Sequence, residues 1–136
     1  MPRNPGTFAS VPGAAQLFAS ATAPQYLYGD AIQTKSVAHG SLMALIAATA
    51  STSTLSITAN WQVSTDGTTY YDCVAMNSPA NVALITGTGT VATVNKAIDA
   101  PNVTGWRYAR LKAANTGANA DAANDGVTIS YKYSRV

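Results

Sequence analysis

The chain has 136 residues and a net charge of +2, and charged residues make up only 10% of it, against about 25% in an average soluble protein. This length predicts one folded domain. The Lys and Arg residues are scattered along the sequence, which argues against nucleic-acid binding. The sequence has no apolar run of about 18 residues, so no membrane span is predicted. All six acidic residues are Asp, while Thr and Val are common, which favours β-structure. A surface so poor in charge is typical of a protein that works in an assembly.

The first 24 residues contain four prolines and two glycines, which disfavour a regular element. We predict an extended N-terminal arm over residues 1–24, followed by a β-sandwich domain over residues 25–136. A disordered leader is the alternative, but disordered tails usually lack large apolar residues. The arm carries four of them, which we expect to anchor it against its own domain or a neighbouring subunit: Phe8, Val11, Leu17 and Phe18.

Short strands are predicted along the rest of the chain, separated by turn residues. The apolar run Ser41–Ala48 fits a buried strand or a short helix, and its Gly and Thr/Ser flanks favour the strand. The long segment Asn115–Gly126 is rich in small residues and predicts a loop. The first predicted strand covers Tyr26–Tyr28 and Ala31–Val37, with a kink at Gly29-Asp30. The others, the hairpin excepted, are Ser41–Ala48, Val82–Thr86, Thr90–Asp99, Trp106–Ala113 and Val127–Tyr133.

The clearest pattern lies in Thr54–Val74, where apolar and polar residues alternate with a period of two. Asp66-Gly67 interrupts the alternation and is typical of a tight hairpin turn. We therefore predict a half-buried antiparallel hairpin, with Trp61 on its core-facing side.

Counting the two strands of this hairpin, the chain has about eight short strands and no predicted helix. This pattern predicts an all-β fold, an antiparallel two-sheet sandwich. With eight strands, a jelly roll is favoured over an immunoglobulin-like sandwich.

No group of residues predicts catalysis, cofactor binding or metal binding. His39 is the only histidine and has no partner at ligand spacing, and Cys73 is interpreted as a small buried hydrophobe. Asp121 and Asp125 in the Asn115–Gly126 loop could bind a hard cation, but a solvated connector is the favoured interpretation. We expect neither an enzyme nor a cofactor.

Three aromatic residues are candidates for an exposed patch: Tyr71, Trp106 and Tyr133. With Tyr108, Tyr71 and Trp106 could instead form a sugar platform, which keeps a carbohydrate- or receptor-binding module of a phage fibre or tail as an alternative function.

Three segments together resemble the capsid cement or decoration proteins of tailed bacteriophages: WQVSTDGTTYY (Trp61–Tyr71), WRYARLK (Trp106–Lys112) and VTISYKY (Val127–Tyr133). The resemblance implies a jelly roll with an N-terminal arm and no catalytic residues. It implies a virion structural protein that binds the outer surface of an icosahedral shell and bridges neighbouring coat subunits. We therefore expect the major capsid protein and further copies of this chain, as a dimer or trimer, to be its partners. Neither nucleic acid nor membrane is an expected partner, and synthesis is expected in the host cytoplasm.

Overall fold

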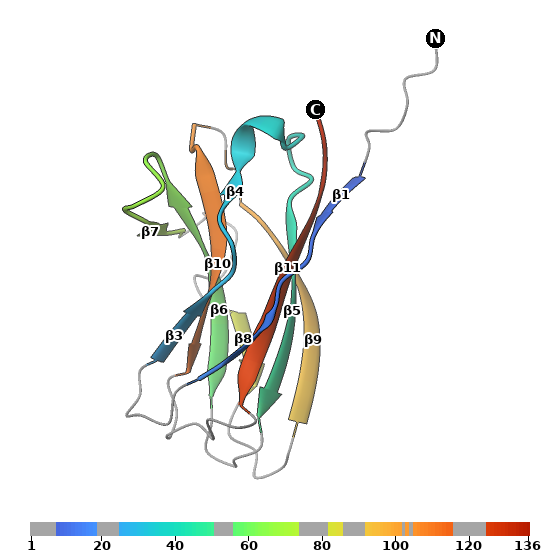
Figure 1. Cartoon of the computed structure of the whole chain (residues 1–136), viewed down its shortest axis with the longest axis vertical. Coiled ribbons are helices and arrows are strands. Elements are labelled where there is room, and N and C mark those ends of the chain that lie inside the picture. The colour runs from blue at the N-terminus through green and yellow to red at the C-terminus, as the bar shows by residue number, and fades with distance from the viewer. Residues whose placement is uncertain are drawn as a thin grey trace.

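The computed structural model describes residues 8–18, 25–50, 56–73, 82–85, 92–101, 103, 105–115 and 125–136. These residues form short strands and one 3₁₀ helix, η1, arranged as two facing sheets (Figure 1). They include no helix long and apolar enough to cross a membrane. The elements are β1 (Phe8–Val11), β2 (Ala15–Leu17), β3 (Gln25–Tyr28), β4 (Ile32–Gln33), η1 (Thr34–Ser36), β5 (Met43–Ala50), β6 (Ile57–Ser64), β7 (Tyr71–Asp72), β8 (Val82–Ile85), β9 (Ala92–Asp99), β10 (Tyr108–Asn115) and β11 (Gly126–Ser134).

Both sheets are antiparallel. The first has the order β1-β11-β5-β9, with β2 also on β11, and the second has the order β3-β10-β6-β7, with β4 on β10 and β8 on β6. The pairs β1/β2, β3/β4 and β7/β8 each occupy one position, so each sheet has four positions. We number the eight positions along the chain, so that β1/β2 is position 1, β3/β4 position 2, β5 position 3, β6 position 4, β7/β8 position 5, β9 position 6, β10 position 7 and β11 position 8. The first sheet then has the order 1-8-3-6 and the second has the order 2-7-4-5. This is the arrangement of a jelly roll, and the predicted two-sheet antiparallel sandwich is confirmed.

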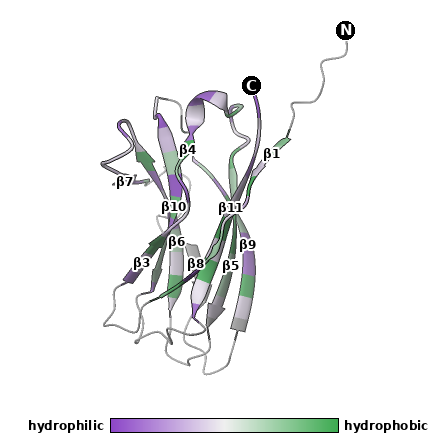
Figure 2. Cartoon of the chain, in the orientation of Figure 1, coloured by the Kyte–Doolittle hydropathy of each residue, from purple (hydrophilic) through white to green (hydrophobic). Residues whose placement is uncertain are grey.

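The core lies between the sheets, where alternate side chains of facing strands interdigitate. Figure 2 shows apolar and polar residues alternating along the strands. Trp61 of β6 is 4% exposed, which confirms its predicted core position, and its ring centroid lies 5.7 Å from that of Tyr131 in β11. The largest fully buried apolar or aromatic side chains are Tyr131, Phe18, Ile46, Ile57, Leu111 and Ile129.

Tyr131 connects the two sheets through its hydroxyl group. The backbone N–H of Leu111 in β10 donates to this oxygen at 3.1 Å. The contact lies beside the segment between β3 and β4, which contains Gly29. A Cβ on Gly29 would be 2.1 Å from the Tyr131 hydroxyl oxygen. Gly29 is therefore needed because the tyrosine approaches its backbone closely. Burial raises the pKa of Tyr131 to about 12.

The predicted hairpin is present, but two of its details were wrong. It was expected to be half-buried, yet the polar side chains Asn60, Gln62 and Ser64 of β6 are also buried. Its return strand is only two residues long. The Asp66 carboxylate accepts the N–H groups of Thr68 and Thr69 at 2.8 Å each, which extends the turn at the expense of the second strand.

Other predicted strands also differ in detail from the observed elements. The strand predicted over Ser41–Ala48 is β5, which begins and ends two residues later. Residues Thr34–Ser36, expected to be part of a strand, form η1, because the N–H of Val37 donates to the carbonyl of Thr34 at 3.0 Å and closes a turn. The strand predicted over Trp106–Ala113 is β10, which begins and ends two residues later.

The N-terminal segment lies along β11, and residues 8–18 are part of the sandwich. A Cβ on Gly13 would be 1.7 Å from the carbonyl oxygen of Ile129, and one on Gly126 would be 2.0 Å from that of Gln16. The segment therefore packs directly on β11 at two points where only glycine fits. Phe18 completes the core with 1% of its surface exposed.

At the other edge of the first sheet, the described residues pair β9 only with β5. Lys96 is opposite Ile46 in the register, and the Ile46 side chain is buried in the core. Lys96 therefore projects from the core-facing side at the margin of the sheet, where it is exposed. An inward-pointing charge of this kind discourages an edge strand from pairing with another chain.

Candidate functional site

The outward surface of the second sheet gathers the cation–π contacts and the ion pair found among the described residues. Its strands β3, β6 and β10 and the β7 segment present residues at alternate positions that share one face. We call this surface the tyrosine–arginine face. It consists of Tyr26, Tyr28, Asn60, Gln62, Tyr70, Asp72, Arg110 and Lys112.

Arg110 is at the centre of this face. Its guanidinium carbon lies 4.0 Å from the ring centroid of Tyr28 and 3.7 Å from that of Tyr70. Its Nε donates to Oε1 of Gln62 at 2.9 Å. Cation–π contacts of this kind contribute about 0.5–1 kcal/mol each at exposed sites, so the guanidinium is held in one position.

Asp72 organises the neighbouring part of the face. Its Oδ1 accepts from Nζ of Lys112 at 2.9 Å, from Nε2 of Gln62 at 3.0 Å and from Nδ2 of Asn60 at 3.0 Å. Hydrogen bonds from Lys112 and Gln62 lower the pKa of Asp72 to about 2. The carboxylate is therefore ionised and its charge is already balanced by donors of the same chain.

The turn before β7 brings Tyr70 over the face. The Ser64 hydroxyl accepts the N–H of Gly67 at 2.9 Å and donates to Oδ1 of Asp66 at 3.0 Å. Gly67 has a φ of 77°, which glycine adopts without strain. Hydrogen bonds from the backbone of Thr69 and Thr68 lower the pKa of Asp66. The turn is thus closed by its own side chains, and it leads directly into Tyr70.

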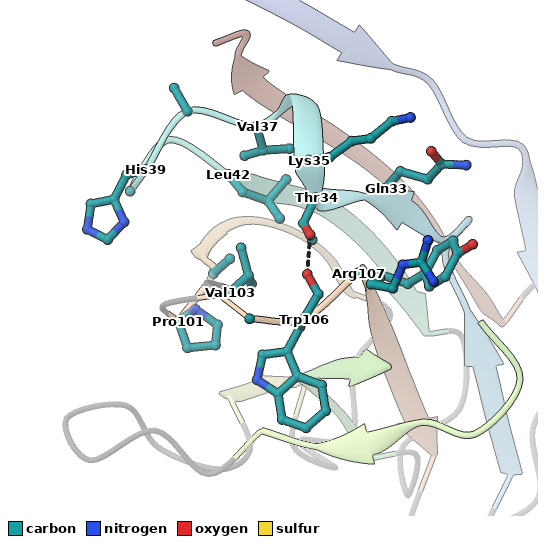
Figure 3. A pocket seen from close by; sticks show the side chains of 15 residues that line it. Gln33, Thr34, Lys35, Val37, His39, Leu42, Pro101, Val103, Trp106 and Arg107 are labelled. Carbon is teal, nitrogen blue, oxygen red and sulfur yellow. Dashed lines mark hydrogen bonds between the residues drawn. The ribbon is translucent and has the colours of Figure 1, made fainter. Parts of the chain in front are cut away.

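A cavity of about 450 Å³ opens at the end of the sandwich, between η1 and the β9–β10 connection (Figure 3). The Thr34 hydroxyl donates to the Trp106 carbonyl across it. Figure 3 shows the apolar side chains of Val37 and Leu42 in its wall, with His39 at one side and Arg107 at the opposite side. Its described lining residues include no Asp, Glu, Cys or Ser.

The four predicted arm anchors divide into two pairs. Phe8 and Leu17 are exposed, at 77% and 50%, on the edge strands of the first sheet. Val11 is half-buried against the core, and Phe18 is fully buried. Two anchors therefore fasten the segment to its own domain, and the other two are exposed.

The predicted aromatic patch is only partly assembled. Tyr71 is 55% exposed, and its ring centroid lies 5.9 Å from that of Trp106, which packs partly against the core. Tyr133 lies on β11 in the other sheet, half-buried against the core, and does not join them. The structure thus brings two of the three residues together.

The described residues include no group of three or more His, Cys, Asp or Glu that could hold a metal ion. Cys73 packs partly against the core, and burial raises the pKa of its thiol. Most of the Asn115–Gly126 loop, with Asp121, lies outside the described residues. Asp125, at its end, is buried.

Arg110, Tyr28, Tyr70 and Asp72 were not predicted as functional residues. A signal for part of the face was present, because Tyr26 and Tyr28, and likewise Arg110 and Lys112, are spaced two apart and so share one side of their strands. Which strands are neighbours could not be read from that spacing.

The fold and its surfaces define a jelly-roll sandwich with one polar aromatic face. No protein-family model and no curated protein matches the sequence. Among solved structures, the chain is similar to a chain in the structure of infectious bursal disease virus, Gx strain, with a TM-score of 0.53 and 8% sequence identity. The match covers 95% of this chain and 32% of the viral chain. At this identity the likeness shows a shared fold, here with a chain from a virus structure.

Proposed function

We propose that this chain is a non-enzymatic structural protein of a bacteriophage virion. It binds the outside of an icosahedral capsid, where it bridges neighbouring coat subunits and stabilises the shell. The observation that carries the proposal is the fold, because 95% of the chain superposes on part of a chain from a virus structure. Its partners are the major capsid protein and further copies of itself.

Bridging two subunits requires two separate contact surfaces, and the chain has candidates on different sheets. The tyrosine–arginine face belongs to the second sheet, whereas Phe8 and Leu17 are exposed on β1 and β2 of the first. Covering an exposed Phe or Leu side chain contributes about 1.5–3 kcal/mol. Individually modest contacts become strong when many copies bind one symmetric shell.

The test is co-sedimentation of the purified protein with capsids that lack it. The wild-type protein is expected to pellet with shells in a number of copies comparable to the coat subunit. A variant with Phe8→Ser and Leu17→Ser is expected to bind more weakly, while the exposed Ser10→Ala on the same strand serves as the matched control. Failure of the wild-type protein to pellet at any salt concentration would contradict the proposal.

One observation favours the alternative of a carbohydrate- or receptor-binding module of a phage fibre or tail. The exposed Tyr71 ring rests on Trp106 beside the cavity at the end of the sandwich, and aromatic pairs beside a cavity are suited to small ligands. A glycan array distinguishes the two functions. Binding that is lost in Tyr71→Ala, together with no shell binding, would favour the alternative.

A further inference from the structure

We propose that the tyrosine–arginine face is a docking surface for a carboxylate-bearing protein surface, and that Arg110 receives the carboxylate between Tyr28 and Tyr70. The inference rests on the proposed function, since it assigns this face to the contact with the coat.

The composition of the face is typical of a protein interface. The chain has seven Tyr residues, and three of them, Tyr26, Tyr28 and Tyr70, contact the cations of this face. Tyr and Arg are the residues enriched at the energetic centres of protein interfaces. Tyr26 and Tyr28 remain 48% and 38% exposed, so their rings are accessible to a partner.

The face is already ordered in the unbound chain. Arg110 is held by two rings and by Gln62, and Gln62 is in turn fixed by its hydrogen bond to Asp72. Ordering a flexible side chain costs about 0.5–1.5 kcal/mol at an interface. Because these contacts exist in the unbound chain, binding through Arg110 does not bear that cost.

Charge decides the chemistry of the partner. Within the described residues, the ion pair of this face joins Asp72 to Lys112, and the Asp72 carboxylate also accepts from Asn60 and Gln62. Among the described residues, Arg110 contacts neutral groups, the amide of Gln62 and the phenol rings of Tyr28 and Tyr70. Its positive charge is therefore not matched within the face, and a planar guanidinium is suited to bidentate recognition of a carboxylate.

The shape of the face favours a protein over a saccharide. It is the outer surface of a sheet, and the large cavity lies at the end of the sandwich beyond Arg110 and Lys112. Small ligands bind in concave sites, whereas protein partners use broad surfaces. Arg110 also covers one face of the Tyr28 ring and one face of the Tyr70 ring, which leaves less ring surface for sugar stacking.

The test measures shell binding by wild-type protein, Arg110→Gln and Arg110→Lys. Arg110→Gln removes the cation from its contact with the partner's carboxylate. We therefore expect the variant to bind shells about 30-fold more weakly than the wild type. Arg110→Lys is expected to bind with intermediate affinity, because it keeps the charge and loses the planar stacking. Lys35→Gln, an exposed cation of η1 that lies outside both proposed contact surfaces, is the matched control and should bind as the wild type does.

Footprinting of the wild-type protein gives a readout that does not depend on how a variant folds. Tyr28 and Tyr70 should be protected from hydroxyl radicals when the protein is bound to shells. Arg110→Gln binding within about twofold of wild type, or unchanged reactivity of both tyrosines, would overturn this inference while leaving the proposed function intact. Absence of wild-type binding would overturn both. Arg110-dependent binding to an acidic oligosaccharide, without shell binding, would also refute the protein partner.

Discussion

Replacing Tyr131 by Phe tests how the two sheets are held together. The change removes one oxygen and leaves the ring in contact with Trp61. That oxygen accepts the N–H of Leu111 at 3.1 Å within the core, where water cannot replace it. The variant therefore leaves a buried donor without its acceptor.

An unsatisfied buried donor costs about 1–3 kcal/mol. We expect the free energy of unfolding to fall by about 2 kcal/mol in Tyr131→Phe, which for a chain of this size lowers Tm by about 5–8 °C. Urea denaturation at neutral pH measures the first quantity and calorimetry the second. Amide hydrogen exchange should show faster exchange at Leu111 than in the wild type.

The same hydroxyl gives a second signature at high pH. Its pKa in the folded chain is raised to about 12 from 10.0, so the folded state disfavours the ionised form. The stability linked to this group is complete below pH 10 and is lost as the pH rises through about 12, by roughly 2–3 kcal/mol. Tyr131→Phe lacks this loss, so the difference in stability between it and the wild type should shrink above pH 10.

Tyr133→Phe is the matched control, because Tyr133 is on the same strand and is half-buried. It should change the free energy of unfolding by less than about 0.5 kcal/mol. An equally small change in Tyr131→Phe, with unaltered exchange at Leu111, would refute the inter-sheet role of the hydroxyl group.

Three other substitutions have defined outcomes. Asp72→Asn should lower the free energy of unfolding at neutral pH by about 1 kcal/mol after allowance for solvent exposure. Because the pKa of Asp72 is lowered to about 2 from 3.8, the greater stability of the wild type is present above pH 3.8 and is lost as the pH falls towards 2. Urea titrations across that pH range measure it. Gly13→Ala should release β1 and β2, because its Cβ would lie 1.7 Å from the Ile129 oxygen; unchanged amide protection of β1 would contradict this. Lys96→Val should promote self-association through β9, measured by sedimentation velocity, and a monomer at all concentrations would argue against the protective role.

Local patterns in the sequence determined a large part of the fold. The alternation in β6 identifies the core face that contains Ile57 and Trp61, and Asp66-Gly67 marks the turn. Both depend on neighbouring residues only, because a period of two assigns successive side chains to opposite faces. The composition, poor in charge and rich in Thr and Val, likewise determined the β class.

The N-terminal segment shows where such reasoning ends. Its apolar residues indicated contacts for Phe8 and Phe18, but not that Phe8 would be exposed while Phe18 is buried in the core of its own domain. That division depends on the pairing of β1 and β2 with β11, at the far end of the chain.

The sequence by itself thus determined the class of fold, the main strands and the core side of the central hairpin. Tertiary structure alone decided the order of the strands and the tyrosine–arginine face, in which Tyr28, Tyr70 and Arg110 come from three distant segments. Alternation specifies which side of a strand a residue occupies, whereas the neighbour of that strand is set by long-range pairing and by the packing of the whole core. Arg110 therefore acquires its partners only when β3, β10 and the β7 turn meet.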